Sequence, residues 1–61
     1  MKVRDVIKLV EQGGWYQAAQ KGSHRQFKHP SKPGNVTIAG HPSAEMDRGT
    51  YSNILKQAGL K

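Results

Sequence analysis

One short segment in the middle of the chain holds the residue types best able to act on a phosphodiester. Two of the three histidines, His24 and His29, stand there among the cations Lys21, Arg25 and Lys28. Histidine gains and loses a proton near neutral pH more readily than any other side chain, and cations around it attract a polyanion. We therefore predict that His24 acts on the backbone of RNA, on an open sheet face that the rest of the chain builds.

RNA can be cut without a metal because its 2′-hydroxyl is an internal nucleophile. The reaction needs a base for the hydroxyl proton, an acid for the leaving oxygen, and cations for the charge that develops at the phosphorus. We predict that His24 is the general acid/base. The residues predicted to contact RNA are Lys21, Gly22, Ser23, Arg25 and Lys28. The simpler alternatives are an exposed strand histidine, solvated cations and a serine that only forms a turn.

The other two histidines are candidates for a second proton carrier, but each has a simpler interpretation. His29 precedes a proline on the core-side phase of its segment, which favours a structural role unless the strand ends or bulges there. His41 precedes a proline in a polar loop, where it either reaches the site or is a plain turn residue. The histidines lack the tight spacing of metal ligands and the chain has no cysteine, so we expect no metal and no cofactor.

Periodic apolar residues predict a helix near each end of the chain. Over residues 3–12 one helical stripe follows the i, i+3, i+4, i+7 pattern, and it consists of Val3, Val6, Ile7 and Val10. The same pattern returns near the C-terminus in Tyr51, Ile54, Leu55 and Ala58. Thr50 is the expected N-cap of this second helix, and Gly59 with Leu60 fits a Schellman ending.

Three short segments between the helices are predicted as strands. Residues 15–21 lie between glycines and have a strand-like length, although their central residues would also suit a helix. A tight turn at Gly22-Ser23 returns the chain as a second strand over 24–29. The Pro33-Gly34 pair is typical of a type II turn and leads into a β-branched strand over 35–39.

Alternation along the second strand decides which side chains share a face. Phe27 belongs in the core, so His24, Gln26 and Lys28 are expected to point away from it. Arg25 then falls on the core side, which is tolerable at a rim where its head extends to water. His24 is therefore predicted on the free face.

The order helix, three strands, helix predicts an α+β fold of the type α-β-β-β-α. Each helix has a single apolar stripe, so both are expected to cover one face of a three-stranded antiparallel sheet and to leave the other face to solvent. The adjacent aromatics Trp15 and Tyr16 could each stack on a base, but one must face the core, and Trp15 is the one expected there.

Length and charge bound the kind of protein. Sixty-one residues form one small domain over 1–61, without cysteines that could make disulfides. Ten Lys and Arg against four Asp and Glu give a net charge of +6, which nucleic acid, an acidic protein or an anionic membrane surface could exploit. No apolar run has the length of a membrane span and the N-terminus lacks a signal sequence, so we expect a cytoplasmic protein that binds no membrane.

An ordered set of motifs closely resembles the HicA toxin family. The set consists of Gly13-Gly14-Trp15-Tyr16, Lys21-Gly22-Ser23-His24 with Phe27, Lys28-His29-Pro30, Pro33-Gly34 with Val36-Thr37-Ile38, and Gly49-Thr50 through Ile54-Leu55-Lys56-Gln57-Ala58-Gly59-Leu60. It spans nearly the whole chain in the order of that family. Arg25 departs from the pattern, because many members carry a second histidine there, and the segment Ala44–Arg48 is more acidic than is usual before the last helix.

The resemblance implies a fold similar to the double-stranded-RNA-binding domain, cleavage of mRNA, and neutralisation by a HicB-like antitoxin. It also implies that the catalytic histidine of the family's Gly-Ser-His motif falls on His24. We expect a monomer when the protein is free and a hetero-oligomer with the antitoxin. The alternatives are a non-catalytic RNA-binding module of the same fold and a small basic protein that binds an acidic partner.

Overall fold

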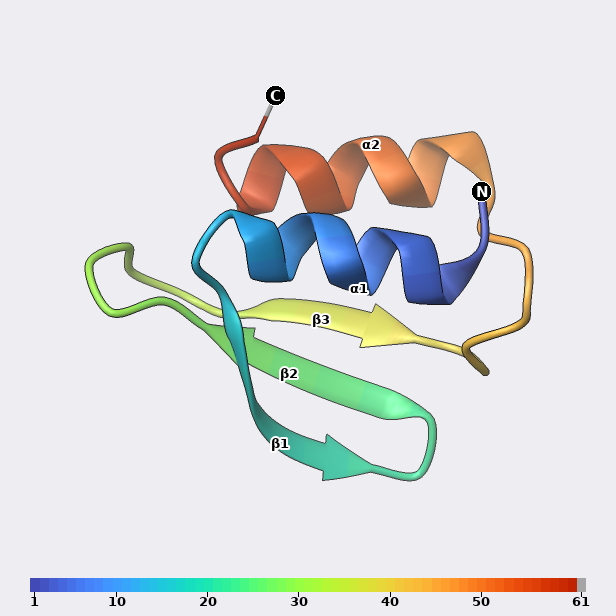
Figure 1. The fold of residues 1–61 in the computed structure, drawn as a ribbon, viewed down its shortest axis with the longest axis horizontal. Helices are drawn as coiled ribbons and strands as arrows, with labels where there is room; N and C mark the ends of the chain where they lie inside the picture. The colour runs from blue at the N-terminus through green and yellow to red at the C-terminus, as the bar shows by residue number, and fades with distance from the viewer. Residues whose placement is uncertain (61) are drawn as a thin grey trace.

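Two helices and three strands make up the structure, a computed structural model that describes residues 1–60. The elements are α1 (Val3–Gln12), β1 (Tyr16–Lys21), β2 (His24–Lys28), β3 (Val36–Ala39) and α2 (Arg48–Gln57). The strands form one antiparallel sheet in the order β1-β2-β3. Figure 1 shows both helices on the same side of the sheet, with β1 farthest from them. The predicted α-β-β-β-α architecture is confirmed, and the strand bounds differ from the prediction by one residue each.

The hydrophobic core lies between the helices and the β2–β3 part of the sheet. Its buried members are Val3, Val6, Val10, Trp15, Phe27, Val36, Ile38, Ile54 and Ala58. Trp15 is only 3% exposed, as predicted, and its indole N–H donates to the Ala58 carbonyl at 3.1 Å. Phe27 is fully buried, so the alternation that places its strand neighbours on the other face holds.

The start of α2 differs from the prediction. The helix begins at Arg48 and its N-cap is Asp47, so the prediction of Thr50 as the cap is wrong. The Asp47 carboxylate accepts hydrogen bonds from the Thr50 hydroxyl at 2.7 Å and the Thr50 backbone N–H at 3.0 Å. These donors hold the pKa of Asp47 below its ordinary value, because they stabilise the carboxylate form. Thr50 is thus the residue that the cap binds, three positions into the motif.

The end of α2 is the predicted Schellman motif. The Leu60 N–H donates to the Leu55 carbonyl at 2.9 Å, and the Gly59 N–H donates to the Lys56 carbonyl at 3.1 Å. Gly59 has a φ of +70°, a left-handed conformation that glycine adopts without strain. This ending turns the chain back toward α1, where Leu60 lies against Gly13.

A β-bulge in β1 sets the direction of its side chains. Tyr16 pairs with Lys28 and Gln17 with Phe27, whereas the next pair is Ala19 with Gln26, so the register shifts between Gln17 and Ala19. Cross-strand partners share a face, and the extra residue of the bulge shifts the alternation of β1 by one position. Tyr16 and Lys21, five positions apart, therefore lie on the same face.

The sheet face turned away from the helices is called the outer face. By register and alternation it carries Tyr16, Ala19, Lys21, His24, Gln26, Lys28, Thr37 and Ala39. All eight residues are exposed. Every residue of β1 is exposed, including those on its other face, because the helices pack over β3 and β2 and do not reach this edge strand.

Candidate active site on the outer face

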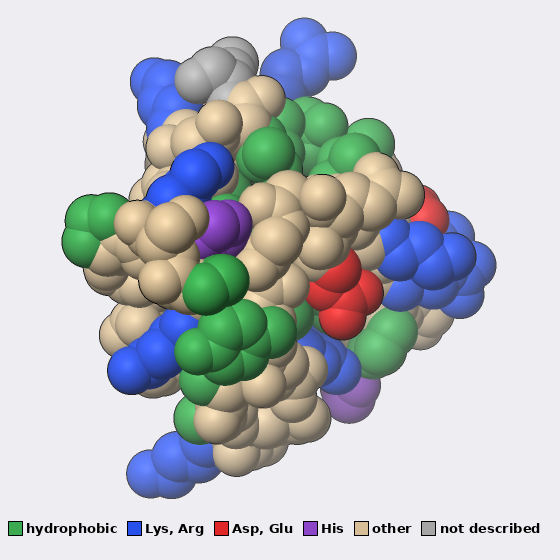
Figure 2. All heavy atoms as spheres, turned by 60° about the vertical axis from the view of Figure 1, so that its left-hand side comes forward, with side chains coloured by type: hydrophobic (Ala, Val, Ile, Leu, Met, Phe, Trp, Pro, Cys, Tyr) green, Lys and Arg blue, Asp and Glu red, His purple; other side chains and the backbone are tan. Residues whose placement is uncertain are grey.

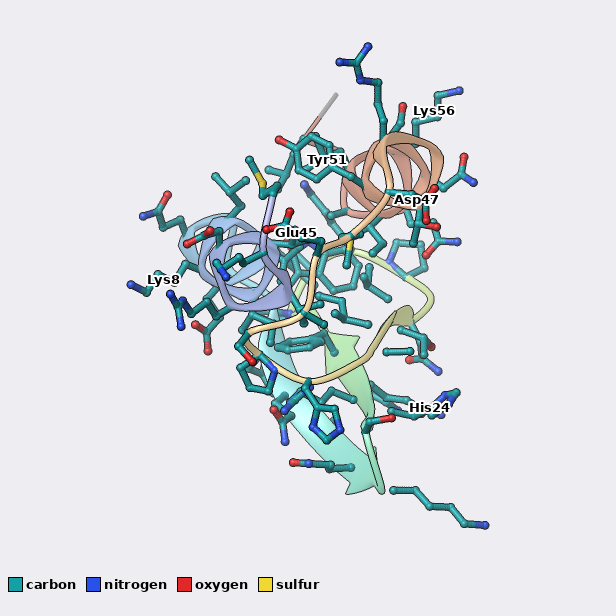
Figure 3. The ribbon with its side chains drawn as sticks, turned by 90° about the vertical axis from the view of Figure 1, so that its right-hand side faces the viewer. Lys8, His24, Glu45, Asp47, Tyr51 and Lys56 are labelled. Atoms are coloured by element: carbon teal, nitrogen blue, oxygen red, sulfur yellow. The ribbon has the colours of Figure 1, made fainter. Side chains whose placement is uncertain are left out.

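His24 opens the central strand of the sheet and is exposed on the outer face. Its backbone pairs with Lys21 of β1 and Ala39 of β3, so two strands hold its position. The phase follows from Phe27, whose burial three positions later puts His24 on the opposite face. Figure 3 shows His24 far from both helices and from the labelled carboxylates Glu45 and Asp47. The prediction that His24 lies on the helix-free face of the sheet is confirmed.

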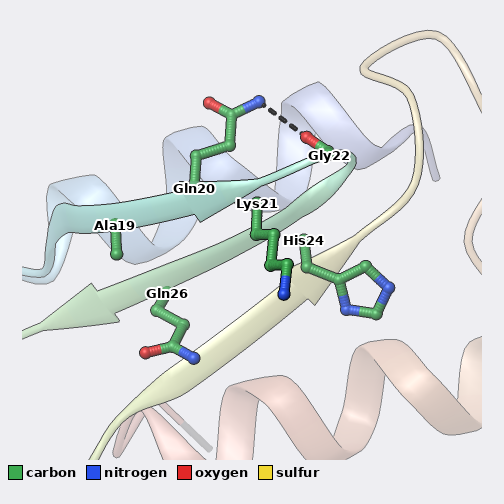
Figure 4. A pocket seen from close by; sticks show the side chains of 6 residues that line it. All are labelled: Ala19, Gln20, Lys21, Gly22, His24 and Gln26. Carbon is green, nitrogen blue, oxygen red and sulfur yellow. Dashed lines mark hydrogen bonds between the residues drawn. The ribbon is translucent and has the colours of Figure 1, made fainter.

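A hollow surrounds His24 at the β1–β2 turn. It is lined by Ala19, Gln20, Lys21, Gly22, His24 and Gln26, and its volume is about 560 Å³. In Figure 4 the side chains of Lys21, His24 and Gln26 project to the same side, whereas Gln20 projects the other way. The Gln20 amide donates to the Gly22 carbonyl at 3.0 Å, which braces the turn from behind. An ammonium and an imidazole thus share one open surface of a size that fits a small ligand.

Of the residues predicted to contact RNA, the structure brings Lys21 and Gly22 together with His24 in the hollow. Lys28 is exposed on the same face at the other end of β2. Ser23 is half-buried in the turn, and its carbonyl accepts the Gly40 N–H at 3.2 Å. Three of these residues therefore lie open around the histidine or along its strand.

Arg25 is half-buried on the core side of its strand, where the alternation predicts it. One guanidinium nitrogen donates to the Gly40 carbonyl at 3.0 Å in a partly buried contact. Arg25 lies on the helix side of β2, opposite His24, because it alternates with it along the strand. Gly40 is thus held twice, by Arg25 through its carbonyl and by Ser23 through its amide.

His29 lies outside the hollow and has both ring nitrogens engaged. Nε2 lies 3.0 Å from the Gly13 carbonyl, which can only accept, so this nitrogen carries the proton. Nδ1 accepts the backbone N–H of Ser31 at 3.1 Å and that of Lys32 at 3.2 Å. The ring also meets Trp15 edge-on, with centroids 5.2 Å apart. These contacts give His29 a structural role, tying the β2–β3 connection to the end of α1.

A residue that sequence reasoning did not connect with His29 is Gly14. A Cβ at this position would lie 2.6 Å from Nε2 of His29, and the φ of Gly14 is +95°. Glycine is therefore required both by the backbone conformation and by the close approach of the ring. The glycine pair after the first helix was the available signal, but its spatial neighbour could not be read from it.

His41 is exposed in the loop after β3. It stands two positions beyond Ala39, which is the cross-strand partner of His24. The loop is anchored because the Ala44 N–H donates to the His41 carbonyl at 2.9 Å and the Arg4 N–H donates to the Pro42 carbonyl at 3.0 Å. His41 therefore belongs to the same end of the sheet as His24, on a tethered backbone.

The charges of the chain are unevenly distributed. Its four carboxylates, Asp5, Glu11, Glu45 and Asp47, lie in α1 and just before α2, so the strand segments contain none. Figure 2 shows basic side chains at many points of one view of the surface and acidic ones only in its right-hand part. Within residues 1–60, no group of three or more potential metal-binding side chains lies together, and no helix is long and apolar enough to span a membrane.

The fold and the site define a small α-β-β-β-α protein whose carboxylate-free sheet exposes a histidine beside a lysine. A comparison with protein families matches residues 3–60 to the family described as "HicA toxin of bacterial toxin-antitoxin". Because this match covers nearly the whole chain, the protein belongs to the HicA toxin family. It is therefore the toxin of a toxin-antitoxin system and has an antitoxin as its partner. A search of curated proteins gave no match.

Proposed function

We propose that this toxin is a metal-independent endoribonuclease that cleaves mRNA with His24 as its general acid/base. The observation that carries the proposal is the exposed imidazole of His24 in a hollow with Lys21, in a chain of the HicA toxin family. A cationic open sheet suits RNA, because clustered positive charge attracts a polyanion. Both the activity and a cytoplasmic location follow as parts of this proposal.

In the proposed reaction His24 takes the proton of a ribose 2′-hydroxyl. The freed oxygen attacks the adjacent phosphorus, the bond from phosphorus to the 5′-oxygen breaks, and the leaving oxygen receives a proton. The products are a 2′,3′-cyclic phosphate and a 5′-hydroxyl end. Lys21 neutralises charge that develops on the phosphate oxygens, and Lys28 binds a phosphate farther along β2. A positioned histidine accounts for about 10²- to 10⁴-fold of such a rate.

The proton for the leaving oxygen comes from a second group. His29 is unsuited to this role because the Gly13 carbonyl and two backbone N–H groups occupy its ring nitrogens. His41 is exposed at the same end of the sheet as His24, so it is the better candidate, and water is the alternative. Replacing His41 by Ala should then remove the alkaline limb of the pH–rate profile, whereas transfer from water leaves that limb unchanged.

The antitoxin partner is proposed to be a HicB-like protein that covers the outer face. An acidic surface would complement Lys21 and Lys28, and its binding would block access of RNA to His24. We infer a monomeric free toxin and a hetero-oligomer with the antitoxin. A non-catalytic RNA-binding module is the second candidate function, because the carboxylate-free outer face would attract RNA even if His24 did not react.

The experiment that separates these functions incubates the purified protein with RNA in EDTA. The nuclease proposal expects cleavage by the wild type and loss of cleavage in His24→Ala, with equal thermal unfolding because the side chain is exposed. Lys8→Ala on the outer surface of α1 is the control for a single substitution away from the sheet. Intact RNA in a gel-shifted wild-type complex would instead support the binding module.

A further inference from the structure

We propose that Tyr16 is a base-stacking subsite for single-stranded RNA, at the opposite end of the outer face from His24. The inference builds on the proposed function, since it names the form of RNA that the face accepts. It rests on the exposure of the ring, on the bulge that directs it, and on the distribution of charge around it.

Tyr16 is the aromatic side chain that the fold leaves uncovered. It is 52% exposed, whereas Trp15 is 3% exposed and Phe27 is fully buried. Tyr51 is half-buried and packs against the core. An aromatic ring without a protein neighbour over one face can stack on a nucleobase, and every base offers a π-face for that contact.

The register of the sheet puts this ring in line with the catalytic histidine. Tyr16 is opposite Lys28, and Lys28 lies on the same face of β2 as Gln26 and His24. Without the bulge after Gln17, a strand that places Lys21 on the outer face would turn Tyr16 to the other side. The bulge thus brings the aromatic ring and both lysines onto one surface.

The path between the two ends suits a single strand. Lys28 lies four residue steps beyond His24 along β2, a distance of about 13 Å at ~3.3 Å per step. At the duplex rise of ~3.4 Å per nucleotide this span holds about four nucleotides, and fewer when the strand is stretched. The side chain of β1 between the two ends is the small Ala19, which leaves room above the sheet.

Charge and shape favour single-stranded RNA as the occupant. The strand segments carry no carboxylate, and Lys21 and Lys28 stand at the two ends of the outer face. In a duplex the bases are already stacked within the helix, so an aromatic side chain cannot stack on them from the side. Contact with Tyr16 therefore requires an unpaired base, and it adds affinity with little preference for sequence.

The test measures binding of a fluorescein-labelled oligouridylate with 2′-O-methyl groups, which binds without being cleaved. Tyr16→Ala should weaken binding by about 5- to 150-fold, the loss expected for one stacking platform. Tyr16→Phe should keep the wild-type affinity, because the ring face remains. The slope of affinity against salt should not change in either variant, since no phosphate contact is removed.

Gln17→Ala is the matched control, because Gln17 is exposed on the same strand but lies on the other face. It should bind the oligonucleotide as the wild type does, and Tyr16→Ala should not weaken binding of an RNA duplex. Equal affinity of Tyr16→Ala and wild type for the single strand would overturn the subsite, as would equal losses for duplex and single strand. If the wild type binds this oligonucleotide but does not cleave unmodified RNA in EDTA, the nuclease proposal is contradicted and the subsite is not, so the two failures are distinguishable.

Discussion

His24 is exposed to solvent because Phe27, three positions further along the same strand, is buried. The phenyl ring is fully buried under the helices, and a strand that buries position 27 must turn position 24 to the opposite face. The same alternation separates Arg25 from His24, although the two are adjacent in the sequence. These two neighbours on one strand therefore point in different directions. His24 points to solvent, and Arg25 donates to the Gly40 carbonyl.

His29 illustrates how one residue type serves two purposes within five positions. Its ring joins the end of α1 to the connection after β2 through contacts with Gly13, Ser31 and Lys32. Replacing His29 by Ala should lower the free energy of unfolding by about 1–3 kcal/mol, because the Gly13 carbonyl loses its partner in a partly buried place. Urea titration measures this change. The cleavage rate per folded molecule should stay at the wild-type level.

His41→Ala is the comparison for that variant, since His41 is exposed and its removal should leave the urea midpoint unchanged. If His29→Ala were as stable as the wild type and inactive, His29 would belong to the reaction and its structural role would be wrong.

At the scale of elements, most of the fold could be predicted from the sequence. Each helix has an apolar stripe with a period of 3.6, and each strand lies between glycine or proline turns, so element order and type follow from local patterns. The bulge in β1 could not be predicted, because it depends on how Gln17 and Ala19 pair with β2. The contact of Arg25 with Gly40 likewise depends on two segments that meet only in the folded chain.

Local sequence does not identify the cap of α2, because Asp47 and Thr50 are both good capping residues. The structure shows Asp47 binding the N–H and the hydroxyl of Thr50. Asp47, the first of the two, is the N-cap, and Thr50 donates to its carboxylate. The observed cap lies three residues before the predicted one, and the apolar face of the helix is the same.

The Asp47 cap predicts a dependence of stability on pH. The pKa of Asp47 is lowered in the folded protein, so the cap stabilises the fold at a pH above its ordinary value near 4 and loses this effect as the pH falls through the lowered value. Asp47→Asn should keep the hydrogen bonds from Thr50 and should remove this part of the acid sensitivity. Asp47→Ala should lower the melting temperature at neutral pH.

Melting curves of the three proteins between neutral and acidic pH, followed by circular dichroism, test this. A wild-type protein and an Asp47→Asn variant with the same pH dependence would show that the carboxylate of Asp47 adds nothing beyond the hydrogen bonds.

At the scale of the whole molecule, the carboxylates are sorted to one side. The carboxylates stand in α1 and just before α2, whereas the strand segments hold cations only. A polyanion on the outer face therefore meets Lys21 and Lys28 and no carboxylate of the strands. An antitoxin that covers the outer face hides the cations and the histidine in one step.

The salt dependence of RNA binding should report this sorting. The plot of log affinity against log salt has a negative slope. Lys21→Ala and Lys28→Ala should each make it shallower by about 0.7, the value for one phosphate contact on a single strand. Lys8→Ala removes the same charge from the exposed side of α1 and should leave the slope unchanged. Fluorescence anisotropy with a short uncleavable RNA, over a series of salt concentrations, gives these slopes. Equal slopes in all three variants would mean that RNA is bound by net charge alone.

The most direct test of the central claim uses a DNA oligonucleotide that contains a single ribonucleotide, so that only one 2′-hydroxyl is present. In EDTA the wild type should cut after that ribonucleotide and leave a 2′,3′-cyclic phosphate, which mass spectrometry identifies. Folded His24→Ala should lose about 10²- to 10⁴-fold in rate. Cleavage of an all-DNA strand, or an undiminished rate in His24→Ala, would contradict the account.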